Sequence, residues 1–540
     1  MMRAAPWLLL TAVLASTAAA YRPALAGPFV LDDWGSIEAN MRLRTPDAVR
    51  FPAPLEMLGP DRRLTEVTFA LDLREAGLDP VRFHVVGLLL HLAAVVAAFS
   101  FLSSLLRRSG HPRPRTLALG VAGLFALHPI QAESVAYAAQ RSEVLASLLY
   151  LVALALLDRA ASAWPGWRGA LSWAGGGAAW LLGMGAKTIA ISAPGAFLLE
   201  QAVVAPAPER GAGPLRRRAA RALLLAAPLL ALAAWSASLH FRSFEATPGG
   251  GAGFTATALG AGAYFLTQLR VQWLYLRLLA WPDALAFDRA FAPSTGPDGA
   301  VLAAGAGIAV LLGIAGWLWL RAERSDGPRP AERLGAFGIL FWFVALSPTS
   351  SFVPVADLAV EHRVYLACLG PFLAATVGAD AMLHRLLPRP RAAAAGAALA
   401  VTVLLALGLA LHSRARVWSS AEALWEAAAT ASPGAAPATG PVPRPPTSGP
   451  GGWRAIPGAP RAWLATTPPC SWTPAVPPRR SRCWTGVSPS PRASSRCTET
   501  ARRRSPSSAA RRRRSRRPAR PSASRRRIRS CATSSARHSQ

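Results

Sequence analysis

The sequence predicts an all-α protein that crosses a membrane many times. Of its 540 residues, 52% are hydrophobic, and the mean hydropathy of +0.27 is ordinary for a membrane protein and high for a soluble one. Hydrophobic runs recur throughout the first 411 residues, and short arginine-rich loops separate several of them. Because a span needs about 20 hydrophobic residues, we expect a bundle of about 11 transmembrane helices.

The amino-terminal run, residues 1–21, has the single arginine, hydrophobic stretch and small residues of a signal peptide. Many hydrophobic runs follow it, so we interpret it as a signal-anchor helix. Residues 22–80 are polar and rich in acids, and we expect a first outside loop there. The membrane domain is expected over residues 81–411. Its hydrophobic runs lie at about 83–106, 116–128, 144–157, 169–185, 188–204, 222–239, 301–320, 334–348, 364–383 and 392–411.

The arginine-rich loops predict the orientation. With a cytoplasmic amino terminus, the loops after the second, sixth and tenth runs all lie inside, as the positive-inside rule requires. The segment Thr255–Trp281 must then return to its own side, so we expect an interfacial helix. The 22–80 loop and the carboxy terminus lie outside. The basic loop residues are Arg107, Arg108, Arg113, Arg115, Arg210, Arg216, Arg217, Arg218, Arg221, Arg385, Arg389 and Arg391.

The formal charge of +31 is concentrated at the carboxy terminus. Residues 434–540 contain 23 arginines and one acid, Glu499, whereas the other 433 residues carry a net charge of +9. We expect this tail to be disordered, as a functional basic tail or as an out-of-frame remnant of a repeat domain. Because it lies outside the cytoplasm, we expect no nucleic-acid partner. The cysteines show no metal-ligand spacing.

Two adjacent acids, Asp32 and Asp33, follow the first hydrophobic run, between Phe29 and Trp34. A carboxylate at the membrane surface can act as a general base. Paired acids can equally be solvated loop residues.

A second polar stretch, from His128 to Glu143, follows the third run. If residues 133–141 are helical, Glu133, Tyr137 and Arg141 share one face at positions i, i+4 and i+8. A helix cap with a network of salt bridges is the structural alternative.

Two further groups lie where hydrophobic runs begin or end. Lys187 is the single lysine beside 58 arginines, and its compact ammonium suits one phosphate oxygen. Its survival by chance is the alternative. Glu361, His362 and Arg363 begin another run, where ionisable groups are functional candidates, although interfacial anchoring also explains an arginine there.

Six segments in order carry a resemblance to a known family. They are FVLDDW, DRRLTEVTFALDLREAGLDPVRFHVVGLLLHL, LHPIQAESVAYAAQRSEVLASLLYL, YFLTQLRVQWLYLRLL, SPTSSFVPVADLAVEHRVYL and RVWSSAEALWEAAATASP. Together they resemble bacterial relatives of the transmembrane-and-tetratricopeptide-repeat O-mannosyltransferases, in the GT-C glycosyltransferase superfamily, over about residues 5–433. Residues 412–433 look like the start of the repeats. The family usually has an acid after the lysine, whereas Thr188 follows Lys187 here.

This resemblance implies a GT-C-like bundle that transfers a sugar, mannose-like, from a polyprenyl-phosphate donor to a hydroxyl acceptor. The implied place is the outer face of a bacterial cytoplasmic membrane, and the implied partners are membrane lipid, the lipid-linked sugar and a protein or glycan acceptor. No metal ligand is assigned, and a divalent metal is left open. A transporter or flippase of lipid-linked sugars is one alternative, and a non-catalytic anchor for a repeat domain is another.

The same resemblance suggests roles for individual residues. Asp33, or its neighbour Asp32, would be the general base. Cations would bind the leaving phosphate, and other polar groups would position the acceptor or hold those cations. The phosphate-binding residues would be Lys187, Arg141 and Arg363, and the positioning residues would be Glu133, His128, Glu143, Glu361 and His362.

Overall fold

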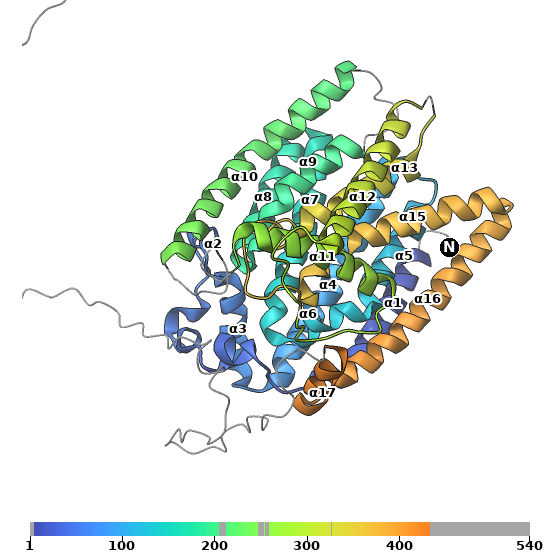
Figure 1. The fold of residues 1–540 in the computed structure, drawn as a ribbon. Helices are drawn as coiled ribbons and strands as arrows, with labels where there is room; N and C mark the ends of the chain where they lie inside the picture. Colours follow the sequence, from blue (N-terminus) through green and yellow to red (C-terminus); the bar gives the residue numbers. More distant parts are fainter. Residues whose placement is uncertain (1–4, 205–211, 247–252, 254–258, 326, 433–540) are drawn as a thin grey trace, which may run out of the picture. The chain divides into compact units, whose positions relative to one another are not determined.

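The computed structural model is helical throughout the residues that it describes, which are 5–204, 212–246, 253, 259–325 and 327–432 (Figure 1). All of them belong to one compact unit, Met1–Pro457. The expectation of a disordered or out-of-frame tail at 434–540 falls outside the described residues.

The chain folds into helices of very different length. The α-helices are α1 (Ala5–Tyr21), α2 (Pro54–Met57), α3 (Arg63–Ala76), α4 (Pro80–Arg108), α5 (Pro114–Leu127), α6 (Ala132–Ala136), α7 (Arg141–Ala163), α8 (Trp167–Ala186), α9 (Ala193–Val203), α10 (Ala212–Ala246), α11 (Ala261–Ala280), α12 (Gly299–Glu323), α13 (Pro330–Leu346), α14 (Val364–Ala367), α15 (Leu369–Leu386), α16 (Arg389–Val417) and α17 (Ala421–Ala431). Tighter helical turns cover Arg22–Ala26, Trp34–Glu38, Met41–Arg44, Pro46–Val49, Pro129–Gln131, Ala138–Gln140, Thr188–Ser192 and Glu361–Arg363.

Helix α4 illustrates how sequence defines these elements. Asp79 caps its amino terminus by accepting a hydrogen bond from the Val81 N–H, and Pro80 occupies the first turn, where no amide donor is needed. Arg107 and Arg108 occupy the last turn, where positive charge is favourable. Its 29 residues extend over about 43 Å at 1.5 Å per residue. This exceeds the roughly 30 Å hydrocarbon thickness of a bilayer.

Six helical segments of the described chain have the length and hydrophobicity of a membrane span, and a helix pair bent by 53° would be a seventh. The prediction of about 11 spans is therefore not shown. Several expected runs form helices shorter than a full span, such as the 14-residue α5 and the 17-residue α13. The six segments are Pro6–Ala26, Pro80–Arg108, Ala138–Ala163, Ala219–Phe244, Gly299–Glu323 and Arg389–Val417, and the bent pair is Glu361–Ala367 with Leu369–Leu386.

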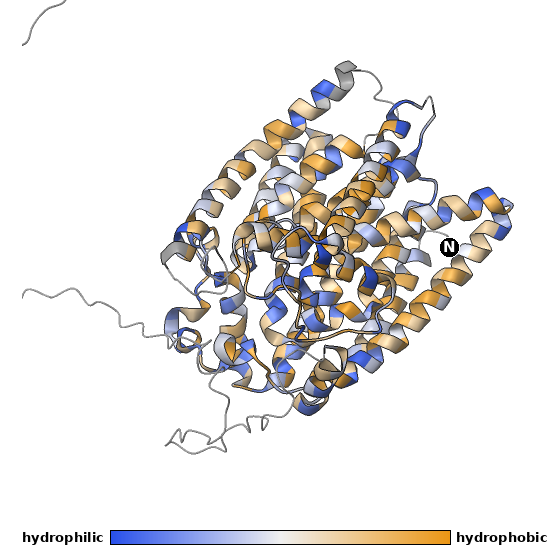
Figure 2. Cartoon of the chain, in the orientation of Figure 1, coloured by the Kyte–Doolittle hydropathy of each residue, from blue (hydrophilic) through white to orange (hydrophobic). Residues whose placement is uncertain are grey.

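Polar contacts divide the helix ends into two groups. At one end of α4, Arg108 pairs with Asp158 of α7 and with Glu200 of α9, the latter at 2.7 Å. At its other end, the His84 ring bonds the Gly27 carbonyl at 3.1 Å. We call the first group the arginine-rich end, because Arg107 and Arg113 also lie there. Figure 2 shows hydrophilic residues concentrated near helix ends and loops, with hydrophobic stretches between them.

The second group, which we call the loop end, gathers the helix ends beside residues 27–33, 133–143, 187 and 361–363. Helix α4 packs against α5 and α7, α7 against α8, and α16 against α1, α5 and α15 (Figure 1). The backbones of α13 and α15 approach most closely at Gly338 and Gly370, where an added Cβ would lie 2.5 Å or less from a carbonyl oxygen of the other helix.

The 22–80 loop and the segment after α16 each contain a helix. The 22–80 loop contains the 14-residue helix α3, which packs against α8. After α16, Ser420 caps α17 through the Ala423 N–H at 3.2 Å. The described chain ends at residue 432, after this one helix, so a tetratricopeptide repeat is not shown.

Candidate functional site

The Asp32–Asp33 pair lies at the loop end, and its two side chains have opposite surroundings. Asp33 is fully buried. Its carboxylate accepts hydrogen bonds from the Val30 N–H at 3.0 Å and from the Ala139 N–H at 2.6 Å. Burial raises the pKa of Asp33 to about 7, and the two backbone donors oppose this shift. Asp33 thus ties its own loop to the segment before α7.

Asp32 instead exposes its carboxylate, which has no hydrogen-bond partner among the described residues. Its backbone N–H donates to the Tyr137 hydroxyl at 2.7 Å. Leu31, just before it, adopts a left-handed conformation with φ of 38°, which is uncommon for a residue other than glycine. The loop therefore presents Asp32 outward while Asp33 holds it in place.

The expectation that residues 133–141 form one helix with a shared face is wrong. Helix α6 ends at Ala136, Tyr137 is extended, and α7 begins at Arg141. The break leaves the Ala139 N–H without a helical acceptor, so that it can bond Asp33. Glu133, Tyr137 and Arg141 consequently contact three different partners.

Lys187 forms an ion pair with an acid far from it in the sequence. Its ammonium lies 2.8 Å from Glu143 Oε2 and donates to Gln140 Oε1 at 2.8 Å. Thr65 of α3 bonds the neighbouring Ala186 carbonyl at 3.1 Å, which joins α3 to this turn. Burial lowers the pKa of Lys187, and the Glu143 carboxylate opposes that shift. Glu143 thus takes the place of the acid that the resemblance leads one to expect beside the lysine.

Glu133 and His362 form a second pair, in which Glu133 is buried and His362 is partly exposed. The His362 Nδ1 lies 2.6 Å from Glu133 Oε1, and the Glu361 N–H donates to Glu133 Oε2 at 2.9 Å. Burial raises the pKa of Glu133 to about 8, which the Glu361 amide and the Arg414 charge oppose. Glu361 in turn accepts from the Ala286 N–H at 2.6 Å and lies 3.3 Å from Arg289.

Three predicted residues are engaged by neighbouring protein groups. Arg141 is buried and pairs with Asp72 at 2.6 Å, beneath the Phe69 and Phe83 rings. Arg363 donates to the carbonyls of Asp357 and Leu358. His128 accepts from the Ile130 N–H at 3.2 Å through Nδ1, and its Nε2 lies 3.1 Å from the Leu279 carbonyl.

Sequence reasoning missed Arg62, whose guanidinium has no hydrogen bond or ion pair within the described chain. Solvent reaches its side chain, yet desolvation by the surrounding protein lowers its pKa, as in a recess. The negative charges of Glu143 and Asp32 act on it there. The neighbouring Arg63 instead pairs with Glu66 at 2.6 Å. Glu66 lies four residues after Arg62 and three after Arg63, so helical spacing permits either pair and no signal in the sequence singled out Arg62.

Other missed residues support the predicted ones from a distance. Arg414 of α16 is buried and acts electrostatically on Glu133 and Glu361. Trp418 packs between the Tyr137 and Phe287 rings, at centroid distances of 6.0 and 5.2 Å. Residues beyond α16 therefore contact the side chain that holds the Asp32 backbone.

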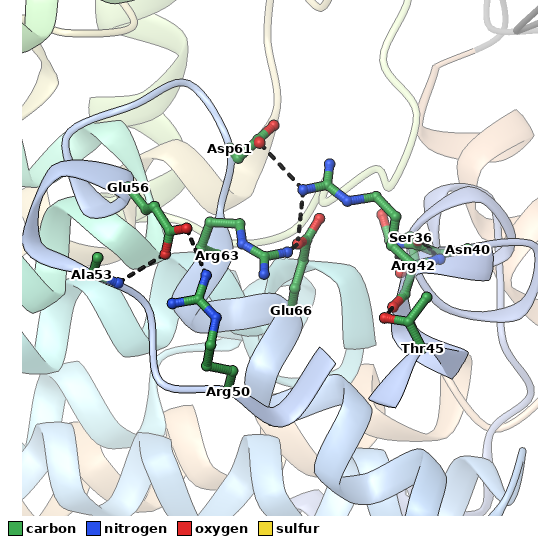
Figure 3. A network of polar contacts seen from close by, with 10 residues as sticks. All are labelled: Ser36, Asn40, Arg42, Thr45, Arg50, Ala53, Glu56, Asp61, Arg63 and Glu66. Carbon is green, nitrogen blue, oxygen red and sulfur yellow. Dashed lines mark hydrogen bonds and ion pairs between the residues drawn. The ribbon is translucent and has the colours of Figure 1, made fainter. Parts of the chain in front are cut away.

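A cavity of about 400 Å³ lies beside this cluster, on the 22–80 loop. We call it the loop pocket. Its charged lining residues are Arg42, Asp47, Glu56, Asp61 and Arg63. Figure 3 shows the ion pairs that hold several of these side chains. Across the ranges that the structure describes, no group of three or more His, Cys, Asp or Glu side chains could hold a metal ion.

The raised pKa of Asp33 predicts a pH dependence of stability. The folded protein holds this proton more tightly than the unfolded chain, so the free energy of unfolding should fall as pH rises from about 4 to about 7. Asp33→Asn should remove this contribution, so that its free energy of unfolding changes less steeply with pH. The variant should nevertheless be less stable than the wild type at low pH. Denaturant unfolding across this pH range, with Asp61→Asn as the exposed control, measures it. Equal slopes in wild type and Asp33→Asn would contradict the assignment.

Comparison with known proteins gives partial matches. Human protein O-mannosyl-transferase TMTC1 is 36% identical over 99 residues, which is 18% of this chain and 10% of the relative. Mouse TMTC1 is 30% identical over 151 residues, which is 26% of this chain and 15% of the relative. Human TMTC2 is 39% identical over 93 residues, which is 17% of this chain and 10% of the relative.

The chain is thus similar in part to protein O-mannosyl-transferases. These matches span only about a tenth to a seventh of the relatives' length. No family model matches the chain. No solved structure matches it either.

Proposed function

We propose that this chain is a membrane glycosyltransferase that moves a mannose-like sugar from a polyprenyl-phosphate donor to a hydroxyl acceptor. The partial similarity to O-mannosyl-transferases and the membrane-length helices support this class of enzyme. One observation carries the mechanism. Asp32 exposes its carboxylate, and its charge and that of Glu143 act on the guanidinium of Arg62, which has no hydrogen bond or ion pair within the described residues. Glu143 also pairs with Lys187.

In the proposed reaction, the acceptor hydroxyl oxygen attacks the anomeric carbon of the sugar. The bond from that carbon to the phosphate oxygen breaks, and its electron pair leaves with the lipid phosphate. The hydroxyl proton passes to the Asp32 carboxylate, which solvent can reach. Asp33 acts as a positioning residue, because its carboxylate already accepts two backbone hydrogen bonds.

The leaving phosphate gains negative charge and requires cations. Arg62 offers an unused planar guanidinium, which suits bidentate binding of phosphate. Lys187 is the second candidate for binding the phosphate, because its ammonium could exchange part of its contact with Glu143 for a phosphate oxygen. Arg141 and Arg363 are less suitable, because buried carboxylate or carbonyl groups already occupy them.

The residues around Glu133 and Glu361 would form the part of the site that binds the acceptor. His362 is fixed by Glu133 through Nδ1, which leaves Nε2 without a partner in the described part of the chain. Arg289 and Arg414 bring positive charge to Glu361, whose backbone N–H bonds Glu133. With the arginine-rich end in the cytoplasm, the proposed site faces outward. In a bacterial cytoplasmic membrane, that side is the periplasm.

Arg62→Gln should raise the KM for the lipid-linked donor about tenfold, because one charge-assisted hydrogen bond to phosphate is lost. The measurement is transfer of labelled mannose from polyprenyl-phosphate mannose by the full chain in nanodiscs. Arg44→Gln is the matched control, since Arg44 is an exposed arginine of the same loop with one long hydrogen bond, to the Asn40 carbonyl at 3.4 Å. An unchanged donor KM in Arg62→Gln would remove Arg62 from the phosphate site.

A liposome assay beside the transfer assay separates the alternatives. A flippase reconstituted in liposomes would move labelled donor across the bilayer without attaching sugar to an acceptor, and Asp32 would be dispensable for it. A non-catalytic anchor would do neither.

A further inference from the structure

We infer that the loop pocket is a saccharide-binding subsite of this protein. The pocket encloses about 400 Å³, which lies within the usual range for small-molecule sites. Its lining residues, apart from Gly59, all carry polar or charged groups, and their aliphatic stems add apolar surface beside those groups.

Four of the five charged side chains that line the pocket have ion-pair partners before any ligand binds. Arg42 lies 3.2 Å from Asp61 and 3.6 Å from Glu66, as Figure 3 shows. Arg63 also pairs with Glu66, at 2.6 Å. On the other side, Glu56 pairs with Arg50 at 2.6 Å and accepts the Ala53 N–H at 2.8 Å. Fixed donors and acceptors reduce the entropy lost on binding.

The balance of charge indicates an uncharged ligand. Three acids, Asp47, Glu56 and Asp61, line the pocket together with two arginines. The acids would repel a phosphate, and the guanidinium groups would repel a metal ion or an ammonium group. Sugar hydroxyls both donate and accept hydrogen bonds, so they can bond carboxylates and guanidinium groups alike.

The position of the pocket connects it with the candidate site. Asp61 and Arg63 line the pocket, whereas Arg62, between them in sequence, lies close enough to Asp32 and Glu143 for their charges to act on it. The segment 61–63 therefore connects the pocket with the proposed reacting groups. The inference rests on the proposed function only for the source of that saccharide, which is the donor sugar or a glycan of the acceptor.

Saccharide binding can be tested without any transfer reaction. The experiment is saturation-transfer-difference NMR on the full chain in nanodiscs, with methyl α-mannoside and a mannobiose as probes. We expect saturation transfer to both probes with the wild type. Asp61→Ala should weaken binding about tenfold, because a hydrogen bond from a sugar hydroxyl to the Asp61 carboxylate is lost. Glu75→Ala is the matched control, since Glu75 is a similarly exposed acid of α3 outside the pocket lining.

Thr45→Trp, which fills the pocket, is a second variant that keeps the test sharp if Asp61→Ala disturbs the loop. Unchanged probe signals in both folded variants would overturn the inference. Saturation transfer to a serine-containing peptide and to neither sugar would also overturn it. Displacement of the probe by polyprenyl-phosphate mannose supports the donor as the source, and displacement only by an acceptor glycan supports the acceptor. A protein that binds the probes in the pocket but transfers no sugar would contradict the proposed function alone.

Discussion

Asp32→Asn is expected to lower the turnover rate of sugar transfer by a factor of about 10² to 10⁴, the usual contribution of a general base. The asparagine side chain keeps the size of aspartate but cannot accept the hydroxyl proton. Because Asp32 is exposed and its side chain has no protein partner among the described residues, the variant should fold normally. Initial rates at saturating donor and acceptor, in nanodiscs, measure the effect.

Glu75→Gln serves as the control for this variant, because it removes an exposed acid at a distance from Asp32 in the same loop region. Asp33→Asn is the informative comparison. It should reduce transfer through displacement of the loop, together with a measurable loss of stability, whereas Asp32→Asn should leave stability unchanged. Full turnover in Asp32→Asn with complete loss in a well-folded Asp33→Asn would reverse the two roles.

Arg141→Met should cost about 3 kcal/mol of stability, because the buried Asp72 carboxylate loses its buried cation and keeps only the partly exposed Arg82, at 3.0 Å. Both side chains are buried, with the Arg141 Nη2 2.6 Å from Asp72 Oδ2. Arg141 also bonds the Phe83 carbonyl and Thr68, so it joins α3, α4 and α7. Denaturant unfolding of the full chain measures the change, and the donor KM of the remaining folded protein should stay near the wild-type value.

A second substitution identifies the cause of this instability. In Arg141→Met with Asp72→Asn, no buried carboxylate is left without Arg141, and Arg82 keeps Glu75 as its partner, so part of the lost stability should return. A stable Arg141→Met with a greatly raised donor KM would instead restore the phosphate-binding role that the sequence suggested for Arg141.

Local patterns in the sequence were sufficient for the helical class and for the segments that meet at the site. Hydrophobic composition predicts membrane helices, and all the candidate segments lie at helix ends or in loops. The count of about 11 spans depended on run length. Runs such as that of α5 form helices too short to be recognised as complete spans by length.

The division of roles within the site could not be read from local sequence. Asp32 and Asp33 are equivalent as neighbours, and only the distant Ala139 amide distinguishes the one that is buried. Likewise, Glu143 becomes the partner of Lys187 through the packing of α7 against α8. The helical spacing of Glu133, Tyr137 and Arg141 suggested a shared helix face that the structure does not have. The tertiary contacts of Asp33 and Tyr137 favour a break in the helix there.

A single-turnover experiment tests the central claim most directly. The full chain in nanodiscs is mixed with a substoichiometric amount of polyprenyl-phosphate mannose, labelled in both sugar and lipid, and with a hydroxyl acceptor. The account predicts one polyprenyl phosphate released for each sugar attached to the acceptor, with both products lost together in Asp32→Asn. Donor that remains intact with the wild type across a range of hydroxyl acceptors, or release of lipid phosphate that Asp32→Asn does not change, would contradict it.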